Sequence, residues 1–187
     1  MRNAKQNKFV SFRRRGPACS ATISDEMRNP FNIDACLSKM NMKRLTATDF
    51  HYSVGNCLFD SMTYFVDEWN GNGMGLRASA IAWAKSEYSL GKSDWCKKIQ
   101  SHFEETLIDE DLYGMRTYSD YLSKMEDPTV YATSIDVFMI SNFLKANIVI
   151  YSNSEHPNEA FCGIFGKTIY LYYNSASLHY EPIVPLY

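Results

Sequence analysis

The sequence predicts an α+β domain, in which helices come first along the chain and strands follow. Apolar residues recur at helical spacing in several segments up to residue 145. After that point the apolar segments are short and rich in β-branched and aromatic residues, which is typical of strands. Helices and strands that are segregated along a chain indicate an α+β fold. The chain has 187 residues, of which 45% are hydrophobic and 21% charged, so one domain with a sizeable core is expected.

Six segments carry helical signals. In segment 57–69, Leu58, Met62 and Phe65 lie about one turn apart and form an apolar stripe. Segment 76–88 is rich in alanine, the residue with the highest helix propensity. The expected helices cover residues 32–43, 57–69, 76–88, 93–107, 117–125 and 134–145.

Four segments near the C-terminus carry strand signals. Residues 147–151 are apolar and β-branched, which predicts a buried strand. Segments 160–165 and 168–173 flank Gly166-Lys167, a dipeptide that permits a tight hairpin turn. The last strand is expected over residues 179–184. We therefore expect adjacent antiparallel strands.

Two stretches are expected to be irregular. Residues 45–55 show no periodicity, and Gly71, Gly73 and Gly75 interrupt the helical pattern. No apolar strand precedes these glycines, so they predict a flexible turn rather than a phosphate-binding loop.

The N-terminal segment is strongly basic. Residues 1–15 contain six Lys or Arg and no acidic residue, although the whole chain carries a net charge of −2. Residues 1–30 are predicted to be a basic, flexible N-terminal tail, and residues 31–187 a single domain. The remaining domain is acidic, which argues against nucleic acid as a partner except for weak binding through the tail.

Composition and spacing argue against several other classes of protein. No apolar run reaches the roughly 18 residues of a membrane helix, and the N-terminus has no apolar core of a secretory signal. A protein of the cytoplasm, or of the host cytoplasm if it comes from a virus or is an effector, with no membrane partner is therefore expected. The five cysteines are widely spaced and form no CxxC pair, so neither a zinc knuckle nor a redox pair is indicated.

Cys57 is the candidate nucleophile. It follows Gly55-Asn56 and opens an apolar helix, whose N-terminal amides and dipole favour a thiolate and can hold an oxyanion. Asn56 is expected to cap this helix. A small buried cysteine without chemistry is the alternative.

His179 is the candidate base. His179 and Glu181 point to the same face of the last strand, and a carboxylate beside an imidazole can orient the ring. A cysteine, a histidine and an acid that folding brings together form a thiol-hydrolase site. An ordinary surface histidine is the alternative. His51, His102 and His156 lie in a loop, a helix and a turn and have weaker cases.

These residues resemble the motifs of a known family. Residues 55–59 (GNCLF) resemble the nucleophile motif of ovarian-tumour (OTU) domain deubiquitinases, usually written DGNCLF. Leu76-Arg77 resembles the family's LR pair, and residues 131–136 resemble a degraded WGG…E motif. Residues 179–181 (HYE) resemble its terminal histidine motif. The resemblance covers residues ~50–185.

Two residues depart from the family pattern. Val54 stands where the family often has an aspartate, so Glu181 is the remaining candidate for the third catalytic residue. Asp60 lies one turn after the nucleophile, where its charge would oppose a thiolate. We expect Asp60 to face away from the sulfur or to be paired.

The resemblance implies a papain-type cysteine protease fold, with a mostly antiparallel sheet flanked by helices. It also implies hydrolysis of the isopeptide bond after the C-terminus of ubiquitin or a ubiquitin-like modifier. In this reaction Cys57 would be the nucleophile, His179 the general base and acid, and Glu181 the group that orients His179. Backbone amides of Val54, Gly55 and Cys57 would hold the oxyanion. The reaction that the resemblance implies needs no metal and no organic cofactor.

Ubiquitin or polyubiquitin is the implied partner. Its tail carries basic residues, so Glu104, Glu105 and Asp109 are candidates to attract it, although a solvated helix end is the alternative. Tyr180 is a candidate wall of the slot beside the histidine, with core packing as the alternative.

A second function is open on the sequence alone. A catalytically weak or inactive OTU-fold ubiquitin-binding module would also explain Val54, Asp60 and the eroded 131–136 motif. The divergence of the motifs fits a viral source, a bacterial effector or a divergent eukaryotic enzyme.

Overall fold

The computed structural model describes residues 32–91, 94–109, 114–152, 158–161 and 165–186. The predicted tail at 1–30 lies outside these residues. The helical elements are α1 (Ile33–Lys39), α2 (Cys57–Thr63), the 3₁₀ turn η1 (Asp67–Trp69), α3 (Gly73–Leu90), α4 (Asp94–Asp109), α5 (Tyr118–Lys124) and α6 (Ser134–Leu144). The strands are β1 (Met42–Arg44), β2 (Ala146–Ser152), β3 (Asn158–Phe161), β4 (Lys167–Asn174) and β5 (His179–Pro185).

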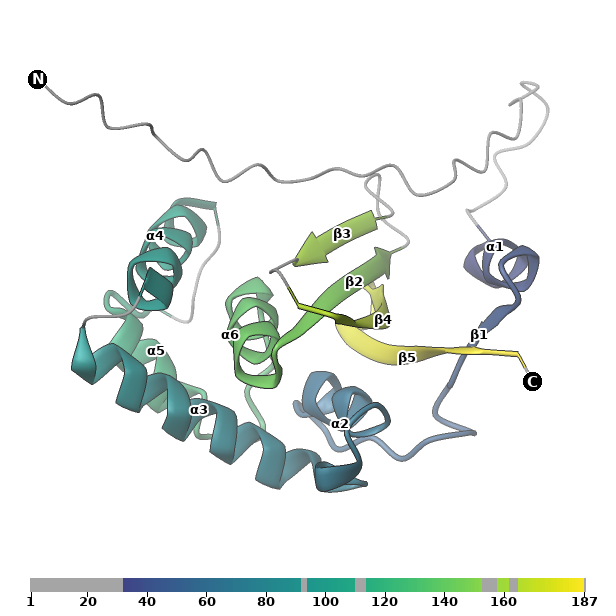
Figure 1. Ribbon diagram of the computed structural model, residues 1–187, viewed down its shortest axis with the longest axis horizontal. Helices are drawn as coiled ribbons and strands as arrows, with labels where there is room; N and C mark the ends of the chain where they lie inside the picture. Colours follow the sequence, from purple (N-terminus) through teal and green to yellow (C-terminus); the bar gives the residue numbers. More distant parts are fainter. Residues whose placement is uncertain (1–31, 92–93, 110–113, 153–157, 162–164, 187) are drawn as a thin grey trace, which may run out of the picture.

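The strands form one sheet in the order β1-β5-β4-β2-β3, and helices pack on both of its faces (Figure 1). The large core lies between the sheet and the layer of helices α2 to α6. A smaller cluster of Ile33, Leu37, Tyr172 and Ile183 joins α1 to the sheet. The predicted α+β class and the mostly antiparallel sheet are confirmed, because three of the four strand pairings are antiparallel.

The predicted hairpin at Gly166-Lys167 is wrong. β3 and β4 lie on opposite edges of β2, and β4 runs parallel to β2 over seven residue pairs. Alternate residues of β2 are buried, and both edges of this strand find backbone partners. A central strand of this kind takes one partner on each side, so the next two strands do not pair with each other.

The first predicted helix is too long. α1 ends at Lys39, and Asn41 adopts a left-handed backbone with φ 57°. This turn frees Met42–Arg44 to form β1, which pairs antiparallel with β5. The segment 32–43, which the apolar spacing predicted as one helix, therefore contains a helix, a turn and the start of a strand.

The predicted flexible turn at Gly71, Gly73 and Gly75 is also wrong in part. Gly73 and Gly75 lie in the first turn of α3, where the Asn72 side chain accepts a hydrogen bond from the Gly75 amide at 2.9 Å. An N-cap of this kind compensates for the low helix propensity of glycine. The second predicted helix ends earlier than expected, at Thr63, and the 3₁₀ turn η1 follows it.

None of the helices in the described part of the chain is long and apolar enough to cross a membrane.

Replacing Leu37 by alanine tests the attachment of α1 to the sheet. Leu37 is fully buried in the small cluster, so the truncation is expected to lower the free energy of unfolding by about 2–3 kcal/mol. The neighbouring Ser38 is exposed, and Ser38→Ala is expected to change this free energy by less than about 0.5 kcal/mol. Urea unfolding measures both variants. Equal effects would contradict the packing of α1.

Candidate active site

An open pocket of about 340 Å³ lies where α2 meets the start of β5. Cys57 and His179 both line it, so folding brings together the two predicted residues, which are far apart in the sequence. The other walls come from the 47–55 loop, Tyr131 and Ser177.

The Cys57 thiol lies against the backbone on either side of His179. The Tyr180 amide donates to Sγ at 3.5 Å, and Sγ donates to the Leu178 carbonyl at 3.8 Å. Ser61, one turn further along α2, donates to the Tyr180 carbonyl at 3.0 Å. These contacts fix α2 against β5 and hold the sulfur next to the histidine.

Burial raises the pKa of Cys57 above its usual value. The amides of Tyr180 and Leu58 act in the opposite direction, and the charge of Asp60 adds to the increase. The expected lowering of this pKa by the helix N-terminus is therefore outweighed, because the thiol is only 4% exposed. The raised pKa favours the neutral thiol of Cys57 over the thiolate.

His179 packs against Tyr52, a residue that the sequence analysis missed. The two rings meet edge to face, with centroids 4.6 Å apart and an interplanar angle of 81°. The Tyr52 hydroxyl donates to the Leu45 carbonyl at 2.6 Å, and burial raises the pKa of Tyr52, so the hydroxyl stays protonated. This anchored ring restricts the rotation of the imidazole.

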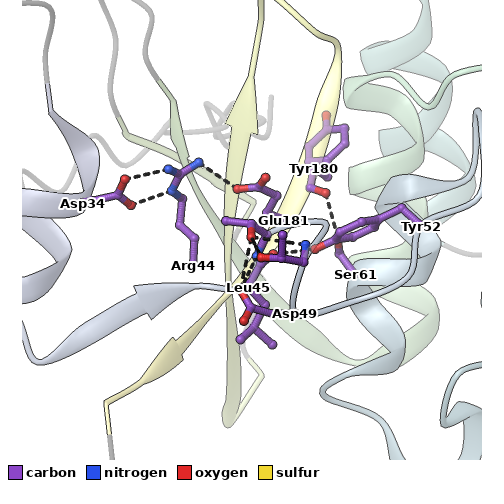
Figure 2. Close-up of polar contacts among 10 residues, drawn as sticks. Asp34, Arg44, Leu45, Asp49, Tyr52, Ser61, Tyr180 and Glu181 are labelled. Atoms are coloured by element: carbon purple, nitrogen blue, oxygen red, sulfur yellow. Dashed lines mark hydrogen bonds and ion pairs between the residues drawn. The ribbon is translucent and has the colours of Figure 1, made fainter.

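Glu181 is held by Arg44, a second residue that the sequence analysis missed. Arg44 Nη1 donates to Glu181 Oε2 at 2.8 Å, and Arg44 Nε and Nη2 each donate to Asp34 at 2.7 Å (Figure 2). This bonding raises the pKa of Arg44 and lowers that of Asp34. No hydrogen bond joins Glu181 to His179 among the described residues. The predicted orienting role of Glu181 stays a prediction.

The turn before Cys57 has the features of an oxyanion site. Gly55 has φ +76°, and an added Cβ would lie 2.5 Å from the Thr129 carbonyl oxygen, so this position requires glycine. The Asn56 amide donates to the Ser53 carbonyl, whereas no carbonyl of the described residues accepts from the Val54 or Gly55 amide. Val54 is 78% exposed, so its side chain contributes nothing to the core.

Asp60 is paired, as expected. Its carboxylate accepts from the Ser53 amide and from Asn56 Nδ2, both at 2.7 Å. Gly73 lies against it so closely that an added Cβ would be 1.9 Å from Asp60 Oδ1. Burial raises the pKa of Asp60.

Asn56 does not cap α2 with its side chain, which corrects the expectation from the sequence. Its amide group is buried and lies between Asp60 on one side and Arg77 on the other. Arg77 Nη1 is 3.5 Å from Asn56 Oδ1, and the same nitrogen donates to the Gly55 carbonyl at 3.1 Å. An amide side chain can serve a cation and an anion at once, because it carries both an acceptor and donors.

The 131–136 segment has a structural part and an exposed part. Asp136 is buried and accepts from the Thr133 amide at 2.8 Å, which completes the capping box of α6. Asp136 also accepts from the Tyr121 hydroxyl. Tyr131 is 38% exposed and lines the pocket, which makes it a candidate for substrate contact.

Neither Tyr180 nor any described residue of the helix that carries the acidic candidates is among the residues that line the pocket. Glu104, Glu105 and Asp109 belong to α4, which packs against α3 and α6 on the far side of the helical layer (Figure 1). None of the described residues that line the pocket comes from α4. Tyr180 is buried in the large core and packs against Tyr173, with ring centroids 4.6 Å apart.

The described residues contain no group of three or more His, Cys, Asp or Glu side chains arranged to hold a metal ion.

A protein-family model described as OTU-like cysteine protease matches residues 52–182 of the chain. No curated protein matches the chain. Among solved structures, the OTU domain of OTUD1 is 15% identical, with a TM-score of 0.57 over 81% of this chain and 91% of that one. The OTU domain protease from Qalyub virus is 11% identical, with a TM-score of 0.54 over 79% and 86%. An OTU domain in complex with ubiquitin is 15% identical, with a TM-score of 0.52 over 77% and 76%.

Replacing Gly73 by alanine tests the contact with Asp60. Helix propensity alone would favour alanine by up to about 1 kcal/mol. The clash with Asp60 Oδ1 reverses this sign, and we expect a loss of about 1–3 kcal/mol in the free energy of unfolding. Gly166 has open space around its Cβ position, so Gly166→Ala is the matched control, with an expected change below about 0.5 kcal/mol. A stabilised Gly73→Ala protein would show that Asp60 is not held there.

The pH dependence of Cys57 alkylation tests its raised pKa. Iodoacetamide reacts with the thiolate, so the rate at Cys57 is expected to be low at pH 7 and to climb continuously through pH 9. Peptide mass spectrometry separates Cys57 from the other four cysteines of the chain. A rate that is high and constant between pH 6 and 8 would indicate a preformed thiolate–imidazolium pair and would contradict the raised pKa of Cys57.

Proposed function

Because this chain belongs to the OTU-like cysteine protease family, we propose that it hydrolyses the isopeptide bond after the C-terminus of ubiquitin or a ubiquitin-like modifier. The observation that carries the proposal is the position of the Cys57 thiol, between the backbone groups that flank His179 and at the wall of an open pocket. A buried cysteine with only a packing role needs no such opening.

The proposed reaction begins with a neutral thiol. As the sulfur of Cys57 attacks the terminal glycine carbonyl, its proton passes to His179, so the raised pKa of the free thiol does not prevent attack. The tetrahedral intermediate collapses to a thioester, and the imidazolium returns the proton to the departing lysine amine. Water then attacks the thioester with His179 as the base, which releases the free carboxylate of the modifier.

The turn before Cys57 supplies the electrostatic part of the proposal. The amides of Val54, Gly55 and Cys57 are candidates to hold the carbonyl oxygen as it becomes negative. The glycine backbone at Gly55 and the bonds to Asp60 and Arg77 keep this turn in place before substrate arrives. Catalysis by preorganised donors requires this rigidity.

The exposed residues at the rim of the pocket favour the proposal that the substrate is a peptide tail. Val54 and Tyr131 line the pocket and are 78% and 38% exposed, so both can cover an extended chain that ends in two glycines. Ubiquitin is bound to one of the similar solved OTU domains, which supports ubiquitin as the first modifier to test. The acids of α4 are proposed to act on the body of the modifier rather than in the pocket.

Specific observations favour a second candidate, a ubiquitin-binding module with weak or no catalysis. Val54 replaces the aspartate of the family motif, burial raises the pKa of Cys57, and no hydrogen bond joins Glu181 to His179 among the described residues. A module of this kind would bind the modifier without forming a thioester.

A ubiquitin carrying a thiol-reactive C-terminal group separates the two candidates. The hydrolase is expected to form a covalent adduct at Cys57, which Cys57→Ala abolishes and His179→Ala slows by at least about 100-fold, the usual contribution of a general base. Intact-mass and peptide mass spectrometry locate the adduct. Cys96 is also buried, so Cys96→Ala is the matched control and is expected to react as the unchanged protein does.

Binding of unmodified ubiquitin is measured on the same proteins. Binding without any adduct would favour the module, and an adduct at another cysteine would refute the assignment of the nucleophile.

A further inference from the structure

The contact between Arg44 and Glu181 connects the candidate site to a part of the chain outside the family match. The family model begins at residue 52, whereas Arg44 lies in β1. Its side chain is 18% exposed and that of Glu181 is 12% exposed, so solvent screens this ion pair only weakly.

Arg44 is itself fixed by two other groups. Asp34, on α1, accepts from both Nε and Nη2 at 2.7 Å, which uses the guanidinium as a two-pronged donor. The Cζ atom of the guanidinium lies over the Tyr172 ring, 4.4 Å from its centroid. Tyr172 pairs with Glu181 across β4 and β5, so the cation is held directly beside the carboxylate. The third donor, Nη1, therefore has a defined position.

The second carboxylate oxygen of Glu181, Oε1, is not used by Arg44. A carboxylate has two oxygens, and Arg44 uses Oε2 alone. Among the described residues, Oε1 accepts no hydrogen bond. His179 lies two residues earlier on β5 and therefore on the same face of the strand.

We infer that Arg44 is a positioning residue, which holds Glu181 by Oε2 and leaves Oε1 available to accept a hydrogen bond from Nδ1–H of His179. This bond selects the imidazole tautomer whose Nε2 is unprotonated and available to the Cys57 thiol. The inference rests on the proposed function, which makes His179 the base. It makes the α1–β1 segment part of the catalytic unit, because Asp34 and Arg44 together fix the acid.

Kinetics in a double-mutant cycle test the inference. Arg44→Gln is expected to lower kcat on a ubiquitin substrate by about tenfold with little change in KM, since the binding surface is intact and only the orientation of the base is lost. Lys43→Gln is the matched control, because it removes an exposed positive charge from the same strand, and it is expected to leave kcat unchanged. Arg44→Lys keeps the positive charge but lacks the planar set of guanidinium donors, and is expected to recover only part of the lost kcat.

The decisive comparison uses the Glu181→Ala background. If Arg44 acts through Glu181, Arg44→Gln has less than about a twofold effect on kcat once the carboxylate is absent. An equal tenfold loss in both backgrounds would mean that Arg44 merely supports β1, and would overturn the inference.

A second measurement is independent of activity. The ¹⁵N shifts of the imidazole ring report which nitrogen carries the proton, and a His179→Asn variant identifies its signals among the four histidines. The neutral ring is expected to be the Nδ1–H tautomer in the unchanged protein and to shift towards Nε2–H in Arg44→Gln. The same tautomer in both proteins overturns the inference. A protein that shows the expected tautomers but cleaves no modifier refutes the proposed function alone.

Discussion

The buried guanidinium of Arg77 is the constraint on which the candidate site depends. It projects from α3 and donates to carbonyl oxygens of two segments that are distant in sequence, namely Gly55 before the nucleophile and the loop between α5 and α6. Its acceptors in this loop are Met125, Asp127, Pro128 and Val130, at 2.8 to 3.2 Å. A planar cation with five donors can satisfy such a set of converging carbonyls, which a lysine cannot. The loop in turn lies so close to Gly55 that only a glycine fits there.

Asp60 completes this arrangement from the other side of the turn. Asn56 lies between the two charges, and its side chain contacts Arg77 through oxygen and Asp60 through nitrogen. A buried cation and a buried anion both lose hydration on folding, and the shared amide and backbone partners offset part of that loss. The GNC sequence thus combines three requirements in three residues: a left-handed backbone, a two-sided amide and a thiol. The rigid turn that results is what an oxyanion site needs.

The parts of the site that the sequence could predict are those carried by local patterns. Cys57 at the start of a helix and His179 at the start of a strand are local features, and their meeting in one pocket follows from the fold. Arg44 and Tyr52 could not be predicted, because their partners Glu181 and His179 lie more than 120 residues away, in a strand whose neighbours the sequence does not specify. The parallel pairing of β2 with β4 was missed for the same reason. Sheet order depends on which edges remain open in three dimensions, whereas strand identity depends on side-chain alternation.

Two opposing effects act on the pKa of Cys57, and the lowering by the helix N-terminus is the weaker one. α2 has only seven residues, and Asp60 in its first turn places a negative charge near the positive end of the dipole. Burial then favours the neutral form of Cys57 further, because a thiolate loses more hydration than a thiol when it is buried. The Glu181 charge is balanced by Arg44, so the proposed contribution of Glu181 to His179 is orientation rather than net attraction. In the proposed hydrolase the thiol proton would move together with bond formation, and reactivity would depend on how well the substrate tail is aligned. A neutral, buried thiol reacts slowly with electrophiles that do not fill the pocket, so the burial of Cys57 would make the proposed hydrolase selective for a bound tail.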